Sequence, residues 1–168
     1  MLRFDIEYCY SCCDIRVSKE LTVKWKPQIY NIFRYMPFCH QGIMCKKTLL
    51  EKYPFDSSLK VVADYKWLLK IFMDKVASAQ LNFNFVTFSL FGKSSQKIQE
   101  ANDEAKIIYK DLYKNLYELS DEELDYAVKT SLYPDALEEK FSEYFEDKAL
   151  FVEARNEAKA IRLQEIPD

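Results

Sequence analysis

The feature that most constrains the fold is a helix with one apolar face that is followed closely by an aromatic strand. After Asp64, apolar side chains recur at the spacing i, i+3, i+4, i+7 and i+8, which places them on one face of a helix: Tyr65, Leu68, Leu69, Phe72 and Met73. Residues 82–91 are strongly aromatic and predict a strand. Helices and strands that follow one another in this way predict an α/β fold.

Shorter elements precede this helix. Residues 3–10 and 14–17 alternate loosely and predict one or two short strands. The other elements expected in this part are a turn at 18–20, a short helix within 21–35, a strand at 42–45 and a helix at 46–52. The last helix should end before Pro54, because a proline disfavours helical backbone in the residue before it.

The charge balance changes near residue 93. Residues 1–92 carry 13 basic and 8 acidic side chains, whereas residues 93–168 carry 11 basic and 19 acidic ones. This change predicts two domains, 1–95 and 96–168. The mild positive balance of the first suits a phosphate-bearing ligand or an anionic surface and is too small to indicate binding to nucleic acid.

Residues 96–168 predict a helical appendage. An apolar stripe marks its first helix: Ile98, Ala101, Ala105, Ile108, Leu112 and Leu116. Ser120 to Glu123 has the pattern of a capping box that begins a second helix, Pro134 precedes a third, and a charged helix extends to about Leu163. We expect the apolar stripe to pack within the protein, and a surface for a membrane or a partner is the alternative.

Composition excludes several classes of protein. Only two glycines are present, which excludes a glycine-rich phosphate-binding loop. No apolar run approaches the roughly 18 residues of a membrane-spanning helix, and Arg3, Asp5 and Glu7 interrupt any secretory signal. The chain is therefore predicted to lack a transmembrane segment.

The five cysteines predict free thiols in a reducing compartment. An odd count does not suit a disulfide framework. Cys9 and Cys12 form a C-x-x-C pair, but Cys39 and Cys45 do not provide the second pair that a zinc site needs. We therefore expect reduced thiols and no metal ion.

Asp64 and His40 allow both a structural and a functional interpretation. An aspartate at the start of a helix is well suited to cap it, and residue type alone favours that role for Asp64. His40 is the only histidine, and a lone histidine is more often structural. The order of the surrounding residues gives the functional interpretation its weight.

That order resembles the C-terminal half of the catalytic domain of family 2 glycosyltransferases, in their bacterial polysaccharide branch. The resemblance covers roughly residues 3–95. No single motif in it is specific for the family, but the whole set of motifs, in this order and at these spacings, is. The matching residues are Pro37, Phe38, Cys39, His40, Gln41, Lys46, Lys47, Leu49, Tyr53, Phe55, Asp56, Leu59, Lys60, Ala63, Asp64, Tyr65, Leu68, Leu69, Gly92 and Ser94.

The resemblance implies a partial GT-A fold, a mixed sheet with flanking helices. It also implies transfer of a sugar, with inversion, from a nucleotide-sugar to a hydroxyl of a saccharide acceptor. Asp64 matches the position of the general base. His40 and Gln41, with Gly92 and Ser94, match the pocket for the acceptor or the leaving phosphate. A complete member of the family binds Mg²⁺ or Mn²⁺, and the implied location is cytoplasmic, with the inner face of the membrane as an alternative.

Two departures from the family pattern limit this expectation. The sequence lacks the family's N-terminal nucleotide-binding half, and Tyr8-Cys9-Tyr10 stands where the family has a metal-binding Tyr-Gly-Asp. Asp5 and Asp14 are the nearest alternative carboxylates. We therefore expect a truncated, split or degenerate enzyme that is inactive alone and depends on a separate donor-binding chain or on self-association. A non-catalytic binding or assembly module is the other hypothesis.

Overall fold

The computed structural model describes residues 5–89 and 97–165, and it confirms the predicted α/β class. The chain forms two compact units. One comprises Met1–Ile29 and Met36–Ile98, and contains the sheet. The other comprises Tyr30–Tyr35 and Gln99–Asp168, and is helical. The predicted boundary at residues 95 and 96 lies outside the described residues.

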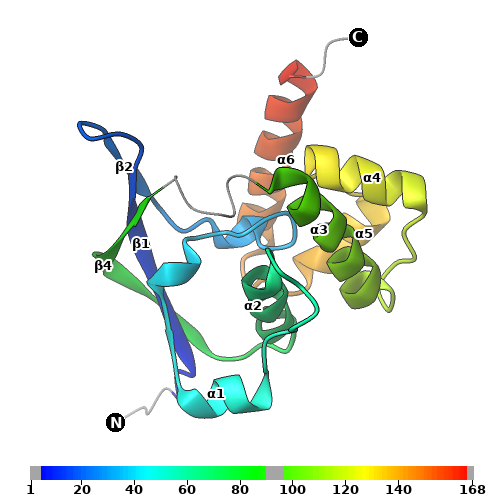
Figure 1. Cartoon of the computed structure of the whole chain (residues 1–168). Helices are drawn as coiled ribbons and strands as arrows, with labels where there is room; N and C mark the ends of the chain where they lie inside the picture. The colour runs from blue at the N-terminus through cyan, green and yellow to red at the C-terminus, as the bar shows by residue number, and fades with distance from the viewer. Residues whose placement is uncertain (1–4, 90–96, 166–168) are drawn as a thin grey trace. The chain divides into compact units, whose positions relative to one another are not determined.

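The sheet unit is organised around one central strand, β1 (Tyr8–Arg16). Two strands pair antiparallel with β1 on one side, β2 (Thr22–Trp25) near its end and β3 (Ile43–Cys45) near its start. The long strand β4 (Ser78–Ser89) pairs parallel with β1 on the other side, so the sheet is mixed (Figure 1). The loop between β1 and β2 contains the predicted turn, where the hydroxyl of Ser18 accepts hydrogen bonds from the backbone N–H groups of Glu20 and Leu21.

Of the one or two short strands predicted in residues 3–17, the structure forms one, because β1 runs without interruption. Strand β4 pairs with β1 from Tyr8 to Arg16, and this ladder keeps the whole segment extended. Two register shifts, on either side of Cys12, absorb the extra residues of β4. The weak alternation of apolar and polar residues in this segment is therefore explained by the register shifts between β1 and β4, and not by a break in the strand.

Two helices accompany the sheet. Helix α1 (Lys47–Lys52) ends where Pro54 was expected to stop it. Helix α2 (Ala63–Met73) buries the predicted residues Leu68 and Leu69 completely, and also Trp67. The ring of Trp67 meets that of Tyr8 on β1 edge to face, with centroids 6.4 Å apart, and its indole N–H donates to the carbonyl of Tyr53 at 2.8 Å. These contacts hold α2 against the sheet.

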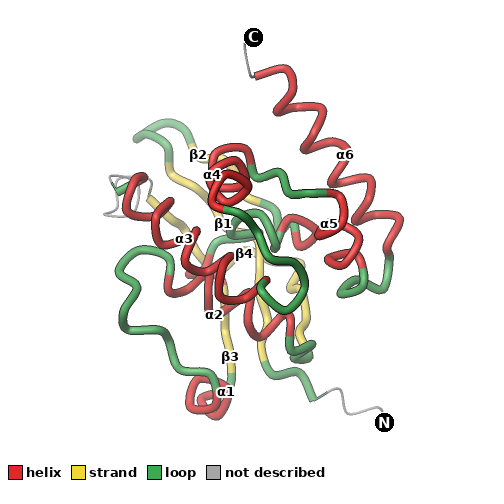
Figure 2. The backbone as a smooth tube through the Cα atoms, turned by 90° about the vertical axis from the view of Figure 1, so that its right-hand side faces the viewer, coloured by secondary structure: helices red, strands yellow, loops and turns green. Residues whose placement is uncertain are grey.

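Among the described residues, the helical unit contains four α-helices: α3 (Ile98–Tyr113), α4 (Asp121–Thr130), α5 (Asp135–Ser142) and α6 (Lys148–Glu165) (Figure 2). Ser120 forms the predicted capping box, since its hydroxyl accepts from the N–H of Glu123 and its own N–H donates to the Glu123 carboxylate. Within the described residues, no helix is both long enough and apolar enough to cross a membrane.

The core of the helical unit includes a six-residue segment from the first third of the chain. This segment is Tyr30–Tyr35. A short helix was expected within residues 21–35, but only Ile29–Asn31 forms a single 3-10 turn. Ile32 and Phe33 are fully buried, and the ring of Phe33 stacks on that of Phe141, with centroids 4.0 Å apart. The segment therefore contributes a large part of the apolar contact that the helices need.

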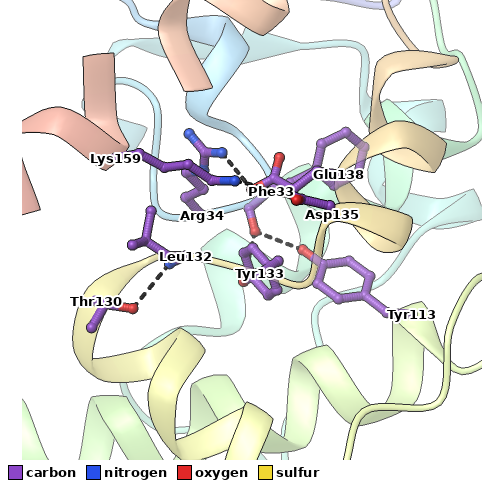
Figure 3. A network of polar contacts seen from close by, with 9 residues as sticks. All are labelled: Phe33, Arg34, Tyr113, Thr130, Leu132, Tyr133, Asp135, Glu138 and Lys159. Carbon is purple, nitrogen blue, oxygen red and sulfur yellow. Dashed lines mark hydrogen bonds and ion pairs between the residues drawn. The ribbon is translucent and has the colours of Figure 1, made fainter. Parts of the chain in front are cut away.

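Tyrosine hydroxyl groups bind the backbone of this segment. Tyr113 and Tyr133 both donate hydrogen bonds of 2.9 Å to the carbonyl of Phe33 (Figure 3). Tyr109 donates a third, also of 2.9 Å, to the carbonyl of Arg34. All three tyrosines are buried, so these bonds satisfy carbonyl groups that water cannot reach.

The predicted apolar stripe on the first helix of this unit was partly wrong. Ile108 is fully buried as expected, but Ile98 is 68% exposed. Tyr109 and Tyr113 take the inner positions instead. The reason is the inserted segment, whose carbonyl groups require hydroxyl donors on the inner face of α3.

The capping box allows a first test of local stability. Replacing Ser120 by alanine removes the acceptor for the Glu123 N–H and should lower the free energy of unfolding by about 0.5–2 kcal/mol. Urea denaturation followed by far-ultraviolet circular dichroism measures this change. Ser142→Ala is a matched control within the same unit, because its hydroxyl only donates to a carbonyl within its own helix. An equal loss in both variants would contradict the role given to the cap.

Candidate functional site

The loop that contains His40 is positioned by a close backbone approach to the sheet. His40–Gly42 forms a 3-10 turn that leads into β3. Gly42 is buried, and a Cβ atom at this position would lie 3.2 Å from the Ser11 hydroxyl on β1. Phe38 precedes the turn and stacks on Tyr10 of β1, with ring centroids 4.2 Å apart. Packing on both sides thus fixes the turn against the sheet.

Asp64 lies in the first turn of α2, but it is not the N-cap. Val62 holds that position, and no side chain makes a capping hydrogen bond there. The interpretation of Asp64 as an N-cap was therefore wrong. One carboxylate oxygen, Oδ1, accepts a hydrogen bond of 2.8 Å from the N–H of Tyr65, the next residue in the chain. The other oxygen points to a different part of the sheet unit.

That second oxygen meets the only histidine of the chain. His40 Nδ1 lies 2.9 Å from Asp64 Oδ2. The side chain of His40 is 40% exposed and that of Asp64 is 29% exposed, so the pair is accessible to solvent without being fully hydrated. Phe88 on β4 meets the imidazole edge to face, with ring centroids 6.5 Å apart. The sequence indicated Phe88 only as one of many aromatic residues in a strand.

Gln41, another predicted site residue, does not join this pair. The side-chain oxygen of Gln41 accepts a hydrogen bond from the Cys39 thiol, with 2.8 Å between sulfur and oxygen. Gly92 and Ser94 lie outside the described residues. Of the predicted set, the structure therefore brings together His40 and Asp64.

Asp56, the nearest other carboxylate in the sequence, has structural partners. Lys66 donates to its Oδ2 at 2.8 Å, and both the N–H and the hydroxyl of Ser58 donate to its Oδ1. The Lys66 ammonium, followed by the Ser58 bonds, holds the pKa of Asp56 well below its ordinary value. Asp56 is therefore a fixed loop carboxylate and a useful control for Asp64.

The residues at the position of the family's metal site do not fit a divalent cation. Tyr8 and Tyr10 face the packed interior with 2% and 7% exposure. Mg²⁺ and Mn²⁺ favour carboxylate oxygens, which this strand segment does not offer. Among residues 5–89 and 97–165, no three histidine, cysteine, aspartate or glutamate side chains are grouped so that they could hold a metal ion. Asp5 and Asp14 thus do not form such a group with other described side chains.

The cysteines are free thiols in the structure, and two are unsuited to metal binding. Burial, with a further contribution from Cys39, raises the pKa of the Cys13 thiol to about 12, and burial also raises the pKa of Cys45. A thiol must lose its proton to bind a metal. We expect purified protein to contain no stoichiometric zinc by atomic emission. Zinc at one equivalent that is lost in Cys9→Ser or Cys12→Ser would contradict this expectation.

No protein-family model, curated protein or solved structure matches the chain.

Proposed function

We propose that the sheet unit is the acceptor side of a glycosyltransferase that transfers a sugar from a nucleotide-sugar to a hydroxyl of a saccharide. The general base comes from the pair of Asp64, the candidate that the resemblance implies, and His40. In such an enzyme a nucleotide-binding half, which residues 3–95 do not match, holds the nucleotide-sugar. This proposal extends the resemblance of residues 3–95 to glycosyltransferases.

The contact between His40 and Asp64 carries the proposal. These residues come from different elements, a 3-10 turn and the start of α2, and their side chains meet at 2.9 Å with part of each exposed. An alcohol is a weak nucleophile, and a basic group within hydrogen-bond reach can take its proton as the new bond to the sugar forms. A carboxylate paired with an imidazole is well suited to that task.

A second function has an observation in its favour. Tyr10, at the position of the family's metal-binding aspartate, is buried and stacked on Phe38. An inherited acceptor pocket without a catalytic metal would bind a saccharide but would not transfer a sugar to it. The second candidate is therefore a saccharide-binding or assembly module.

The experiment that tests the proposal is an assay of sugar transfer by the full chain. Uridine and guanosine diphosphate sugars serve as donors and oligosaccharides as acceptors, first with the chain alone and then with the product of the reading frame upstream of its gene. Transfer in the second mixture supports the proposal. Saccharide binding without transfer in either mixture would favour the binding module.

We expect residues 1–168 alone not to bind nucleotide-sugars, because they resemble only the acceptor half of the family and because no group of three possible metal ligands lies among the described residues. Isothermal titration calorimetry with uridine diphosphate and guanosine diphosphate sugars measures this directly. The titration is run with Mn²⁺ and, as a control, with a chelator. Micromolar binding that requires Mn²⁺ would show that this chain holds the donor itself.

A further inference from the structure

We infer that the proton of the attacking hydroxyl is taken by Nε2 of His40, and that Asp64 acts as a positioning residue that holds the imidazole. This inference rests on the proposed function and names the atom of the pair that accepts the proton. The reasons lie in the contacts of the two side chains.

Both oxygens of the Asp64 carboxylate already face a donor. Oδ1 accepts from the N–H of Tyr65 at 2.8 Å, and Oδ2 lies 2.9 Å from Nδ1 of His40. A substrate hydroxyl that donated to Asp64 would have to share an oxygen with one of these donors. The backbone donor at Tyr65 is fixed by the first turn of α2, so Asp64 is held in one orientation.

The imidazole has its second nitrogen open. The side-chain contacts of His40 within the described part of the chain are the ion-pair contact of Nδ1 with Asp64, at 2.9 Å, and the ring contact with Phe88. With 40% of the side chain exposed, the ring is accessible to solvent. A neutral imidazole has one N–H donor and one acceptor nitrogen, and the group that faces one nitrogen decides which is which. A carboxylate against Nδ1 favours the proton on that nitrogen, which leaves the lone pair on Nε2.

In the proposed step, the lone pair of Nε2 accepts the hydroxyl proton as the oxygen attacks the anomeric carbon. The bond from that carbon to the phosphate oxygen breaks, and the nucleoside diphosphate leaves with the electron pair. The ring becomes an imidazolium, and the Asp64 carboxylate stabilises its positive charge through Nδ1–H. The proton then passes from Nε2 to water.

The first test uses the fact that His40 is the only histidine, so imidazole nitrogen signals in a ¹⁵N spectrum belong to it. The full chain is measured at alkaline pH. We expect a protonated Nδ1 and a bare Nε2 in the wild type, and a loss of this preference in Asp64→Ala. Asp56→Ala is the matched control and should keep the wild-type spectrum. A protonated Nε2 in the wild type would overturn the inference, whether or not sugar transfer is found.

The second test is chemical rescue of sugar transfer in the assay described above. His40→Ala should lower turnover by about 10²–10⁴-fold, the effect of losing a general base, and added imidazole should restore part of it. Formate should not restore turnover in Asp64→Ala, because a free carboxylate cannot replace the lost orientation of the ring. Retained turnover in His40→Ala, with rescue of Asp64→Ala by formate, would identify Asp64 as the base. Absence of transfer by the wild type would instead count against the proposed function, and the tautomer would still decide the inference.

Discussion

Replacing Asp64 by asparagine is expected to lower the rate of sugar transfer by about 10²–10⁴-fold. An asparagine amide cannot accept a proton as a base, and its NH₂ group can donate to Nδ1 of His40 and so favour the unproductive tautomer. Turnover should therefore fall whether Asp64 is the base or the residue that positions it. The measurement is the rate of transfer from a nucleotide-sugar by the full chain with its donor-binding partner.

Stability should change little in the same variant. The pair between His40 and Asp64 is partly exposed, and such pairs contribute about 0–1 kcal/mol. Asp56→Asn is the matched control for turnover, since Asp56 is bound to Lys66 and Ser58 in the loop before α2 and should not affect the rate. Full turnover in Asp64→Asn would exclude a functional role for this carboxylate.

Replacing Glu138 by alanine is expected to destabilise the helical unit by about 3–5 kcal/mol, because it leaves a buried guanidinium without its charge partner. Glu138 Oε1 lies 2.5 Å from Arg34 Nη2, and the two side chains are 0% and 2% exposed (Figure 3). In the described part of the chain, Arg34 Nη1 and Glu138 Oε2 have no hydrogen-bond partner. The pair therefore carries a large desolvation cost that only its mutual attraction offsets.

The two units can be followed separately during unfolding. Both tryptophans, Trp25 and Trp67, belong to the sheet unit, so their fluorescence reports on that unit, whereas far-ultraviolet circular dichroism is dominated by the helices. The dichroism transition should move to lower urea in Glu138→Ala, with less change in the fluorescence transition.

The control for this prediction is an ion pair of the same unit that is exposed. Asp135→Asn removes the pair with Lys159, whose side chains are 72% and 30% exposed, and should cost no more than about 1 kcal/mol. The double variant Arg34→Met, Glu138→Leu should recover most of the loss, because apolar side chains can replace a buried ion pair. Similar losses in Glu138→Ala and Asp135→Asn would contradict the role given to the buried pair.

Local patterns predicted much of the sheet unit. The apolar spacing after Asp64 predicted α2. A helix that buries one face has apolar residues at every third or fourth position, and this spacing is visible in the sequence. Aromatic residues predicted the strand at 82–91, which begins earlier, at Ser78. The sequence left open an interruption between residues 10 and 14, because the ladder that bridges them depends on β4, which is far away in the sequence.

The candidate site was predicted only in part. The order of motifs selected both His40 and Asp64, but residue type alone favoured an N-cap role for Asp64. The contact of 2.9 Å between them results from the packing of α2 and of the 3-10 turn against β1. Gln41 is adjacent to His40 in the sequence, but its side chain accepts a hydrogen bond from Cys39 instead. The spacing of residues in the sequence could not predict this difference between Gln41 and His40.

The sequence by itself determined the elements that depend on neighbours along the chain: α2, the capping box at Ser120, the proline-limited α1 and the helical character of the acidic part. Only the tertiary structure decided that Tyr30–Tyr35 belongs to the helical unit. The buried tyrosine hydroxyls and Glu138 required partners for their polar groups, and the segment supplied backbone carbonyls and Arg34 from 75 to 104 residues away. Contacts between residues so far apart have no regular spacing in the sequence. They could therefore be identified only from the folded structure.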